Sequence, residues 1–157
     1  MYKKILVPLD GSQLAECALL QIQKMAKEGS VGEVTLLNVV KVDIPSWSTM
    51  SESAIPKPID VDAIRKPLFN ASRNYLAKVE SRLGSEGIKV KTESLQGDDS
   101  PADTITNYAN ENGMDMIVIA THGYTGFKKM LLGSVAFGIL HQSNVPVLLI
   151  RPESCRP

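Results

Sequence analysis

The sequence predicts an α/β protein built on a five-stranded parallel sheet with helices on both faces. Short apolar segments alternate with amphipathic segments along nearly the whole chain. Such strict alternation is typical of parallel strands joined by right-handed helical crossovers. The segment MDMIVIA at 114–120 is almost entirely apolar, as expected for a strand covered on both faces. With 157 residues, 43% of them hydrophobic, we interpret 1–157 as a single domain.

The first third of the chain contains two strands and one helix. Ile5 to Leu9 form an apolar run that predicts the first strand. Ser12 is placed to cap a helix whose apolar residues recur at helical spacing. We expect Gly29 and Gly32 to mark the end of this helix, and Glu33 to Val40 to form the second strand.

The middle of the chain breaks this rhythm and then resumes it. Residues 41–60 hold three prolines and four serines without a steady period, so we expect a long mobile loop there. A long helix follows, with apolar residues from Ile64 to Leu83, and Pro67 must lie near its first turn or kink it. Residues 88–96 alternate apolar and polar side chains, which predicts the third strand.

The last third repeats the same pattern twice. Ser100 is a helix cap and Pro101 takes the first helical position of a helix that ends at Gly113. The strand at 114–120 and a helix from about Ser134 to Gln142 follow. Val145 to Arg151 form the last strand, and 152–157 form a short tail.

Charge and composition exclude some classes of function. Seventeen basic residues balance seventeen acidic ones, so the chain has no general electrostatic attraction for nucleic acid. No stretch approaches the roughly 18 apolar residues of a membrane span, and the N-terminal apolar run is too short for a signal peptide. Cys17 and Cys155 form neither a metal pattern nor a disulfide framework; we expect Cys17 to be a small core residue. A cytoplasmic protein is the simplest interpretation.

A parallel sheet of this kind places its ligand site outside the carboxyl ends of the strands, where the strand order reverses. The turn from Pro8 to Asp10 ends the first strand, and a glycine-rich loop from Ala120 to Gly126 follows the fourth strand. If these two strands are neighbours, the turn and the loop face each other across one crevice.

The segment ATHGYTGFKKMLLGSV at 120–135 has the features of a phosphate-binding loop. Gly123 and Gly126 permit close approach of the backbone to a ligand. Gly133 and Ser134 begin a helix, whose free N–H groups and dipole attract anions. The spacing fits neither a Walker A loop nor a dinucleotide fingerprint.

These segments, together with ILVPLDGS, LLNVV and NVPVLLIRP, resemble the universal stress protein family over residues 3–152. Nucleotide-binding members carry Gly, two residues, Gly, nine residues, then Gly-Ser or Gly-Thr. Gly123, Gly133 and Ser134 match that pattern, whereas Ala120 replaces its first glycine. Alanine should fit there unless the position needs a positive φ.

The resemblance implies strand order 3-2-1-4-5, an adenine nucleotide alpha hydrolase-like fold, and binding of ATP, ADP or AMP with Mg²⁺ or Mn²⁺ held through the phosphates. Pro8 and Asp10 would line the adenosine end, and the backbone of Val39 would contact the adenine. The full set of residues that it assigns to the nucleotide is Pro8, Leu9, Asp10, Val39, Ile119, Ala120, His122, Gly123, Gly133, Ser134 and Val135. It also implies a homodimer that pairs its last strands, Val145 to Arg151, and a role in the stress response.

Several residues keep a second interpretation. Asp10 is either a turn former or a partner of the sugar or base, and His122 either contacts phosphate or orders its loop. Lys128 and Lys129 form a solvated helix face or reach phosphate. No catalytic residue is assigned, because no general base stands out beyond Asp10 and His122.

The sequence therefore favours a nucleotide-binding regulatory homodimer with slow ATP hydrolysis at most. Two alternatives are a genuine ATP hydrolase or phosphotransferase, and a nucleotide-free dimeric stress protein. RNA binding through a KH-like G-x-x-G loop, Gly123 to Gly126, is disfavoured, since that loop joins two helices and this one follows a buried strand.

Overall fold

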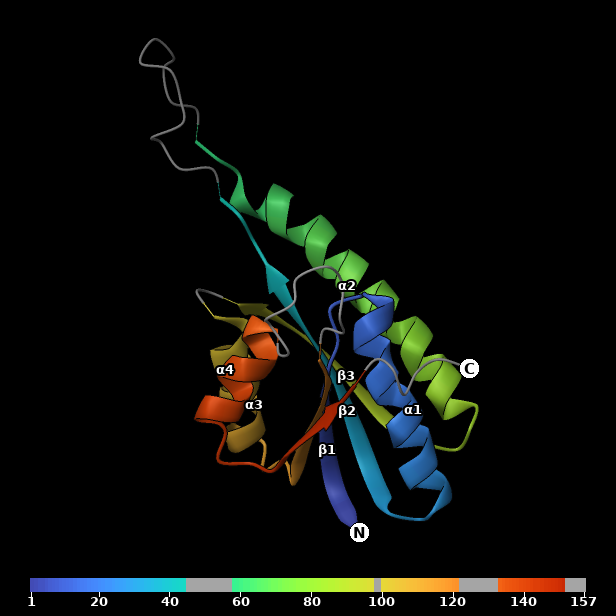
Figure 1. Ribbon diagram of the computed structural model, residues 1–157. Coiled ribbons are helices and arrows are strands. Elements are labelled where there is room, and N and C mark those ends of the chain that lie inside the picture. Colours follow the sequence, from blue (N-terminus) through green and yellow to red (C-terminus); the bar gives the residue numbers. More distant parts are fainter. Residues whose placement is uncertain (45–57, 98–99, 122–132, 152–157) are drawn as a thin grey trace.

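The computed structural model contains five strands and four helices in alternation, and describes residues 1–44, 58–97, 100–121 and 133–151 (Figure 1). In chain order the elements are β1 (Tyr2–Pro8), α1 (Gln13–Lys27), β2 (Val31–Lys41), α2 (Val61–Gly84), β3 (Lys89–Gly97), α3 (Pro101–Glu111), β4 (Met116–Ala120), α4 (Ser134–Gln142) and β5 (Val147–Ile150). The strands form one all-parallel sheet of order β3-β2-β1-β4-β5, which confirms the predicted fold class and strand order.

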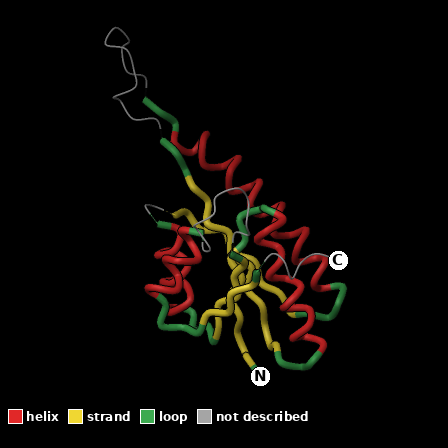
Figure 2. The backbone as a smooth tube through the Cα atoms, viewed as in Figure 1, coloured by secondary structure: helices red, strands yellow, loops and turns green. Residues whose placement is uncertain are grey.

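Helices cover both faces of the sheet. α1 and α2 pack on one face, whereas α3 and α4 pack on the other (Figures 1 and 2). β1 shows how the sequence serves both layers, because its successive side chains point to opposite faces. Ile5 and Val7 join the core under α1 and α2, and Leu6 joins the core under α3 and α4. A strand with two covered faces needs an unbroken apolar run, and β1 has one.

Side chains cap three of the four helices. Ser12 Oγ accepts a hydrogen bond from the backbone N–H of Ala15, 3.1 Å away, and Ser100 caps α3 in the same way. Asp60 caps α2 through its carboxylate. Gly133, the N-cap of α4, has no side chain to contribute, so the first N–H groups of this helix receive no side-chain cap from it.

The element boundaries differ from the predicted ones in a few places. Gly32 lies inside β2 rather than marking the end of α1, because a Cβ there would lie 2.5 Å from the carbonyl oxygen of Lys3. α2 continues through Pro67, which is its seventh residue. β5 is shorter than the predicted Val145 to Arg151.

Two further expectations concern segments only partly covered by the structure. Of the predicted loop 41–60, residues 45–57 lie outside the described residues, as does the tail 152–157. Cys17 lies on the buried side of α1, as predicted. Cys155 lies outside the described residues.

The strand order reverses between β1 and β4. β1 lies between β2 and β4 in the sheet and runs parallel to both. The helix after β1 crosses on one face and the helix after β4 on the opposite face (Figure 1). The predicted adjacency of the first and fourth strands is confirmed, so their carboxyl ends open onto one crevice.

Candidate functional site

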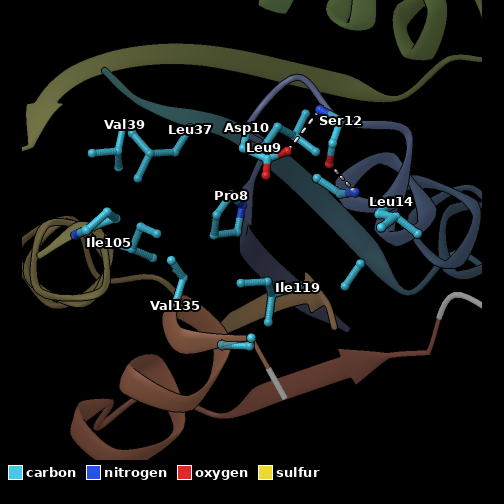
Figure 3. A pocket seen from close by; sticks show the side chains of 15 residues that line it. Pro8, Leu9, Asp10, Ser12, Leu14, Leu37, Val39, Ile105, Ile119 and Val135 are labelled. Atoms are coloured by element: carbon cyan, nitrogen blue, oxygen red, sulfur yellow. Dashed lines mark hydrogen bonds between the residues drawn. The ribbon is translucent and has the colours of Figure 1, made fainter. Parts of the chain in front are cut away.

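A cavity of about 170 Å³ opens at the carboxyl ends of β1, β2 and β4 (Figure 3). Both helices on the α3 and α4 face reach it, as does the start of α1. Its lining residues are Pro8, Leu9, Asp10, Ser12, Leu14, Ala15, Leu37, Val39, Pro101, Ile105, Ile119, Ala120, Gly133, Val135 and Ala136. The cavity therefore lies where doubly wound sheets bind their ligands.

The wall formed by β1 and its turn is held by local hydrogen bonds. Gly11 adopts a φ of 85°, which permits the chain to turn sharply from β1 into α1. Asp10 Oδ1 accepts a hydrogen bond from the backbone N–H of Ser12 at 2.9 Å. The turn-forming role of Asp10 is thus present in the structure, and the carboxylate also faces the cavity (Figure 3).

β2 extends beyond the end of β1 and presents main-chain groups at the cavity. The register of these strands ends at Pro8 and Leu37, and the backbone N–H of Leu9 donates to the carbonyl of Leu37 at 2.8 Å. Main-chain groups two residues apart on a strand point to the same side. The N–H and C=O of Val39 therefore point toward the side that β1 has left, next to the cavity.

The opposite wall comes from β4 and α4. Ile119 and Ala120 end β4, and Gly133 and Val135 belong to the start of α4. No non-glycine residue in the described part of the chain has a positive φ. Ala120 therefore needs no glycine-like backbone, so its replacement of the family's first glycine costs no conformational strain.

The interior of the cavity is mainly apolar. Leu37 and Val39 of β2 lie on one side, with Ile105 of α3 and Val135 of α4 across from them (Figure 3). Leu37 and Val39 lie two positions apart on β2, so both side chains stand on the α3 and α4 face of the sheet. Such a narrow apolar slot with a polar rim suits a flat ring that carries a polar substituent.

The cavity brings together most of the predicted residues that the structure describes. Those that line it are Pro8, Leu9, Asp10, Val39, Ile119, Ala120, Gly133 and Val135. Ser134 is the first residue of α4 and lies between two lining residues without lining the cavity itself. His122 and Gly123 lie outside the described residues, as do Gly126, Lys128 and Lys129.

Sequence reasoning missed the contribution of α1 and α3. Ser12, Leu14 and Ala15 come from the start of α1, and Pro101 and Ile105 come from the start of α3. The sequence pattern did not show that α3 begins beside the end of β2, which brings Ile105 to the cavity. For Ser12 a signal existed, since it caps the helix directly after the β1 turn.

No cluster of three or more His, Cys, Asp or Glu side chains suited to a metal ion occurs among the described residues. Asp10 is the one acidic residue among those that line the described cavity. None of the described helices is long and apolar enough to span a bilayer.

Fold and site together define a doubly wound α/β protein with a ligand cavity at the switch point of its sheet. The sequence profile described as "Universal stress protein family" matches residues 1–151, and the chain belongs to this family. It is 33% identical to universal stress protein MJ0577 of Methanocaldococcus jannaschii, over 98% of each chain. It is 30% identical to universal stress protein YxiE of Bacillus subtilis, over 96% of this chain and 100% of that protein.

Solved structures agree with this assignment. The structure of MJ0577 has a TM-score of 0.74 at 32% identity and covers 96% of both chains. Two more distant structures share the fold: a universal stress protein in complex with cAMP (TM-score 0.66, 18% identity, 95% of this chain and 97% of that one) and an Arabidopsis thaliana family member with AMP bound (0.64, 16%, 95% and 91%). Nucleotides are thus bound by members of this family.

Proposed function

We propose that this protein binds an adenine nucleotide, ATP above all, and acts as a regulatory homodimer in the stress response. The observation that carries the proposal is the pairing of two features in one cavity. The main-chain groups of Val39 lie at one side, and the uncapped N-terminus of α4 at Gly133 lies at the other. The first suits a base, and the second suits phosphate.

The base would enter the apolar slot and pair with the backbone of Val39. A strand residue offers one N–H donor and one C=O acceptor along a single edge. Adenine presents a ring nitrogen that accepts a hydrogen bond beside an amino group that donates one, so it can pair with both the N–H and the C=O of Val39. Guanine presents a carbonyl oxygen and a protonated ring nitrogen at those positions, so the edge disfavours it. Leu37 and Ile105 would cover the faces of the ring.

The phosphates would lie near the start of α4. Free N–H groups and the helix dipole make a helix N-terminus favourable for anions. Gly133, Ser134 and Val135 supply these groups, and His122 and Gly123 remain predicted contributors. Asp10 would repel phosphate, so we assign its free carboxylate oxygen to the sugar hydroxyls, or to Mg²⁺ through water.

Mg²⁺ or Mn²⁺ would be held chiefly by the nucleotide. Mg²⁺ prefers six oxygen ligands and keeps several waters when a protein supplies only one or two carboxylates. The described cavity supplies one, from Asp10. This donor set fits a metal that arrives with the phosphates and not a metal resident in the empty protein.

Rapid hydrolysis finds little support in the described part of the cavity. An ATP hydrolase needs a group that positions the attacking water and groups that stabilise the developing charge. Asp10 is the one titratable side chain among the lining residues, and one of its oxygens already accepts the Ser12 N–H. We therefore favour nucleotide binding with slow hydrolysis at most over an efficient hydrolase or phosphotransferase. Phosphate release well above about one per minute would contradict this preference.

The dimer would form through β5. This strand lies at one edge of the sheet, and its four residues are half-buried. An apolar edge strand carries unpaired main-chain groups that another strand can pair with. A second copy running antiparallel would satisfy them and cover Val147 to Ile150. Sedimentation analysis of wild type and a Leu149→Lys variant tests this, with a monomeric variant expected. We also propose a cytoplasmic location, which fractionation of cells checks.

The central experiment is nucleotide binding by calorimetry, preceded by mass spectrometry of small molecules released on denaturation. We expect ATP to bind more tightly than GTP. Replacing Gly133 by valine together with Ser134 by alanine should abolish binding, because bulk at the α4 N-terminus blocks phosphate.

The chain offers a matched control for this variant. Gly84 and Ser85 form the same dipeptide at the end of α2, where a Cβ on Gly84 would meet nothing within 4 Å. Gly84→Val with Ser85→Ala should bind as wild type does. A wild-type protein that carries no nucleotide, and whose melting temperature ATP leaves unchanged, would instead support the nucleotide-free dimer.

A further inference from the structure

A chain of part-buried hydrogen bonds runs from α2 to the wall of the cavity. Asn38 of β2 donates from Nδ2 to the carbonyl oxygen of Leu9, at 2.6 Å. Its Oδ1 lies 2.6 Å from Oγ of Ser72, on α2. Ser72, only 6% exposed, lies in turn 2.7 Å from Oγ of Ser94, on β3. Three contacts thus join β2, α2 and β3 to the turn that follows β1.

The chemistry of the groups determines which of them is the donor in each of these hydrogen bonds. The Leu9 carbonyl can only accept, so the amide nitrogen of Asn38 faces it. The amide oxygen must then accept from Ser72, which commits the only hydroxyl hydrogen of that serine. Ser94 therefore donates to Ser72. The three bonds form together in one arrangement, so replacing any member leaves a neighbour without its partner.

Hydrogen bonds from β2 hold the chain in place beyond the point where the pairing of β1 with β2 ends. The N–H of Leu9 is held by the carbonyl of Leu37, and the C=O of Leu9 is held by the side chain of Asn38. Two consecutive residues of β2 therefore fix both main-chain groups of Leu9 after β1 stops at Pro8. Leu9 and the following Asp10 line the cavity, so the position of this wall depends on Asn38.

α2 also holds the helix that begins at this wall. Tyr75 donates its hydroxyl to Oε1 of Glu16 on α1 at 3.1 Å, and Arg82 contacts Oε2 of the same carboxylate at 2.7 Å. Burial and the neighbouring Glu16 raise the pKa of Tyr75, which keeps the phenol protonated as a donor. α2 thus contacts Glu16 directly and is linked to Leu9 through Asn38.

We propose that Asn38 is a positioning residue for the nucleotide site and that Ser72 makes its action depend on the placement of α2. The inference rests on the proposed function and adds to it a route by which nucleotide binding and α2 influence each other. Because binding energies are linked reciprocally, a change that breaks the contact of Ser72 with Asn38 would weaken nucleotide binding, and bound nucleotide would stabilise that contact.

The test compares Asn38→Leu, Ser72→Ala and the double variant by calorimetry with ATP. Asn38→Leu keeps the size of the side chain but removes its donor, and should weaken ATP about tenfold. Ser72→Ala keeps the bond to Leu9 and should weaken ATP about threefold. Since Ser72 acts through Asn38, the double variant should match Asn38→Leu at about tenfold, rather than reach the roughly thirtyfold of independent effects.

A control separates positioning from loss of stability. Val79 is a buried residue of α2 that belongs to the core and not to the hydrogen-bonded chain, so Val79→Ala should destabilise the fold and leave the ATP affinity unchanged. Hydrogen exchange without nucleotide should show faster exchange at 9–12 in Asn38→Leu only.

Two results have distinct meanings. A wild-type protein that does not bind ATP would overturn the proposed function. Normal wild-type binding, with single variants that bind equally well or effects that multiply, would overturn the positioning role alone.

Discussion

The packing of α3 against α4 yields the sharpest prediction. A Cβ added to Gly138 of α4 would lie 2.7 Å from Cβ of Ala102 on α3, which is 4% exposed. Carbon atoms in contact lie about 3.5–4.0 Å apart. The variant Gly138→Ala must therefore separate the two helices locally by about 1 Å. Both atoms are attached directly to backbone, so neither can rotate away.

The expected free energy has two opposing parts. Overpacking costs about 1–3 kcal/mol, and alanine in place of glycine stabilises a helix interior by about 1 kcal/mol. Gly138→Ala should therefore lower the free energy of unfolding by about 0–2 kcal/mol. Because this net value is small, the single variant does not isolate the collision.

A double-mutant cycle isolates it. Ala102→Gly removes the methyl group that Gly138→Ala meets, at its own cost of about 1–2 kcal/mol in helix propensity and lost burial. In the double variant the collision is absent, so the coupling between the two changes should be about 1–3 kcal/mol in favour of the pair. Urea unfolding of the four proteins measures it. A coupling below about 0.5 kcal/mol would refute the argument from close helix contact.

The same variant tests the site, because α3 and α4 both contribute residues to the lining of the cavity. Ile105 comes from α3 and Gly133 from α4. Moving the helices apart widens the slot and displaces the helix start that we assign to phosphate. Gly138→Ala should therefore weaken ATP binding about tenfold, and Ala102→Gly should restore most of it.

Three further predictions follow from single contacts. A Cβ at Gly97 would collide with the Val39 side chain, so Gly97→Ala should push that side chain into the cavity. The affinity for ATP, measured by calorimetry, should fall about five- to tenfold. An unchanged affinity would contradict the placement of the base beside β2. Gly32→Ala should destabilise the fold by about 1–3 kcal/mol in urea unfolding without affecting ATP affinity, since it would meet the Lys3 carbonyl far from the cavity. Backbone N–H donors lower the pKa of Asp115, so its stabilising contribution is present above the unfolded pKa of about 3.9 and is lost as the pH falls through the lower folded value. Asp115→Asn should therefore make the free energy of unfolding fall less steeply as the pH is lowered into the acid range. An unchanged pH dependence of the free energy of unfolding would contradict a stabilising role for this carboxylate.

Much of the fold could be predicted because local patterns determine it. The order of elements follows from apolar periodicity, and the capping serines Ser12 and Ser100 marked two helix starts correctly. Gly32 was misplaced because its reason is a contact with a strand that is distant in sequence. A glycine that ends a helix and one that admits a neighbouring backbone are identical in sequence.

Part of the cavity lining could be predicted because its residues follow a strand end. Asp10 and Ala120 were found in this way, because the topology of parallel sheets brings those ends together. Ile105 was missed, since its place in the cavity depends on how α3 crosses the sheet. Asn38 was missed as well, because its importance lies in hydrogen bonds to Leu9 and Ser72 that no spacing reveals.

The early end of β1 has a consequence for how this protein tolerates mutation. Beyond Pro8 the next stretch of β2 lacks its strand neighbour on that side, and Val39 carries the main-chain groups left there. Every amino acid except proline supplies the same N–H and C=O. Many side chains at position 39 would thus preserve the hydrogen bonds to a base, whereas Val39→Pro would remove the donor. Recognition through main-chain groups does not require a particular side chain at this position, so the preference for one base can persist while the surrounding sequence diverges.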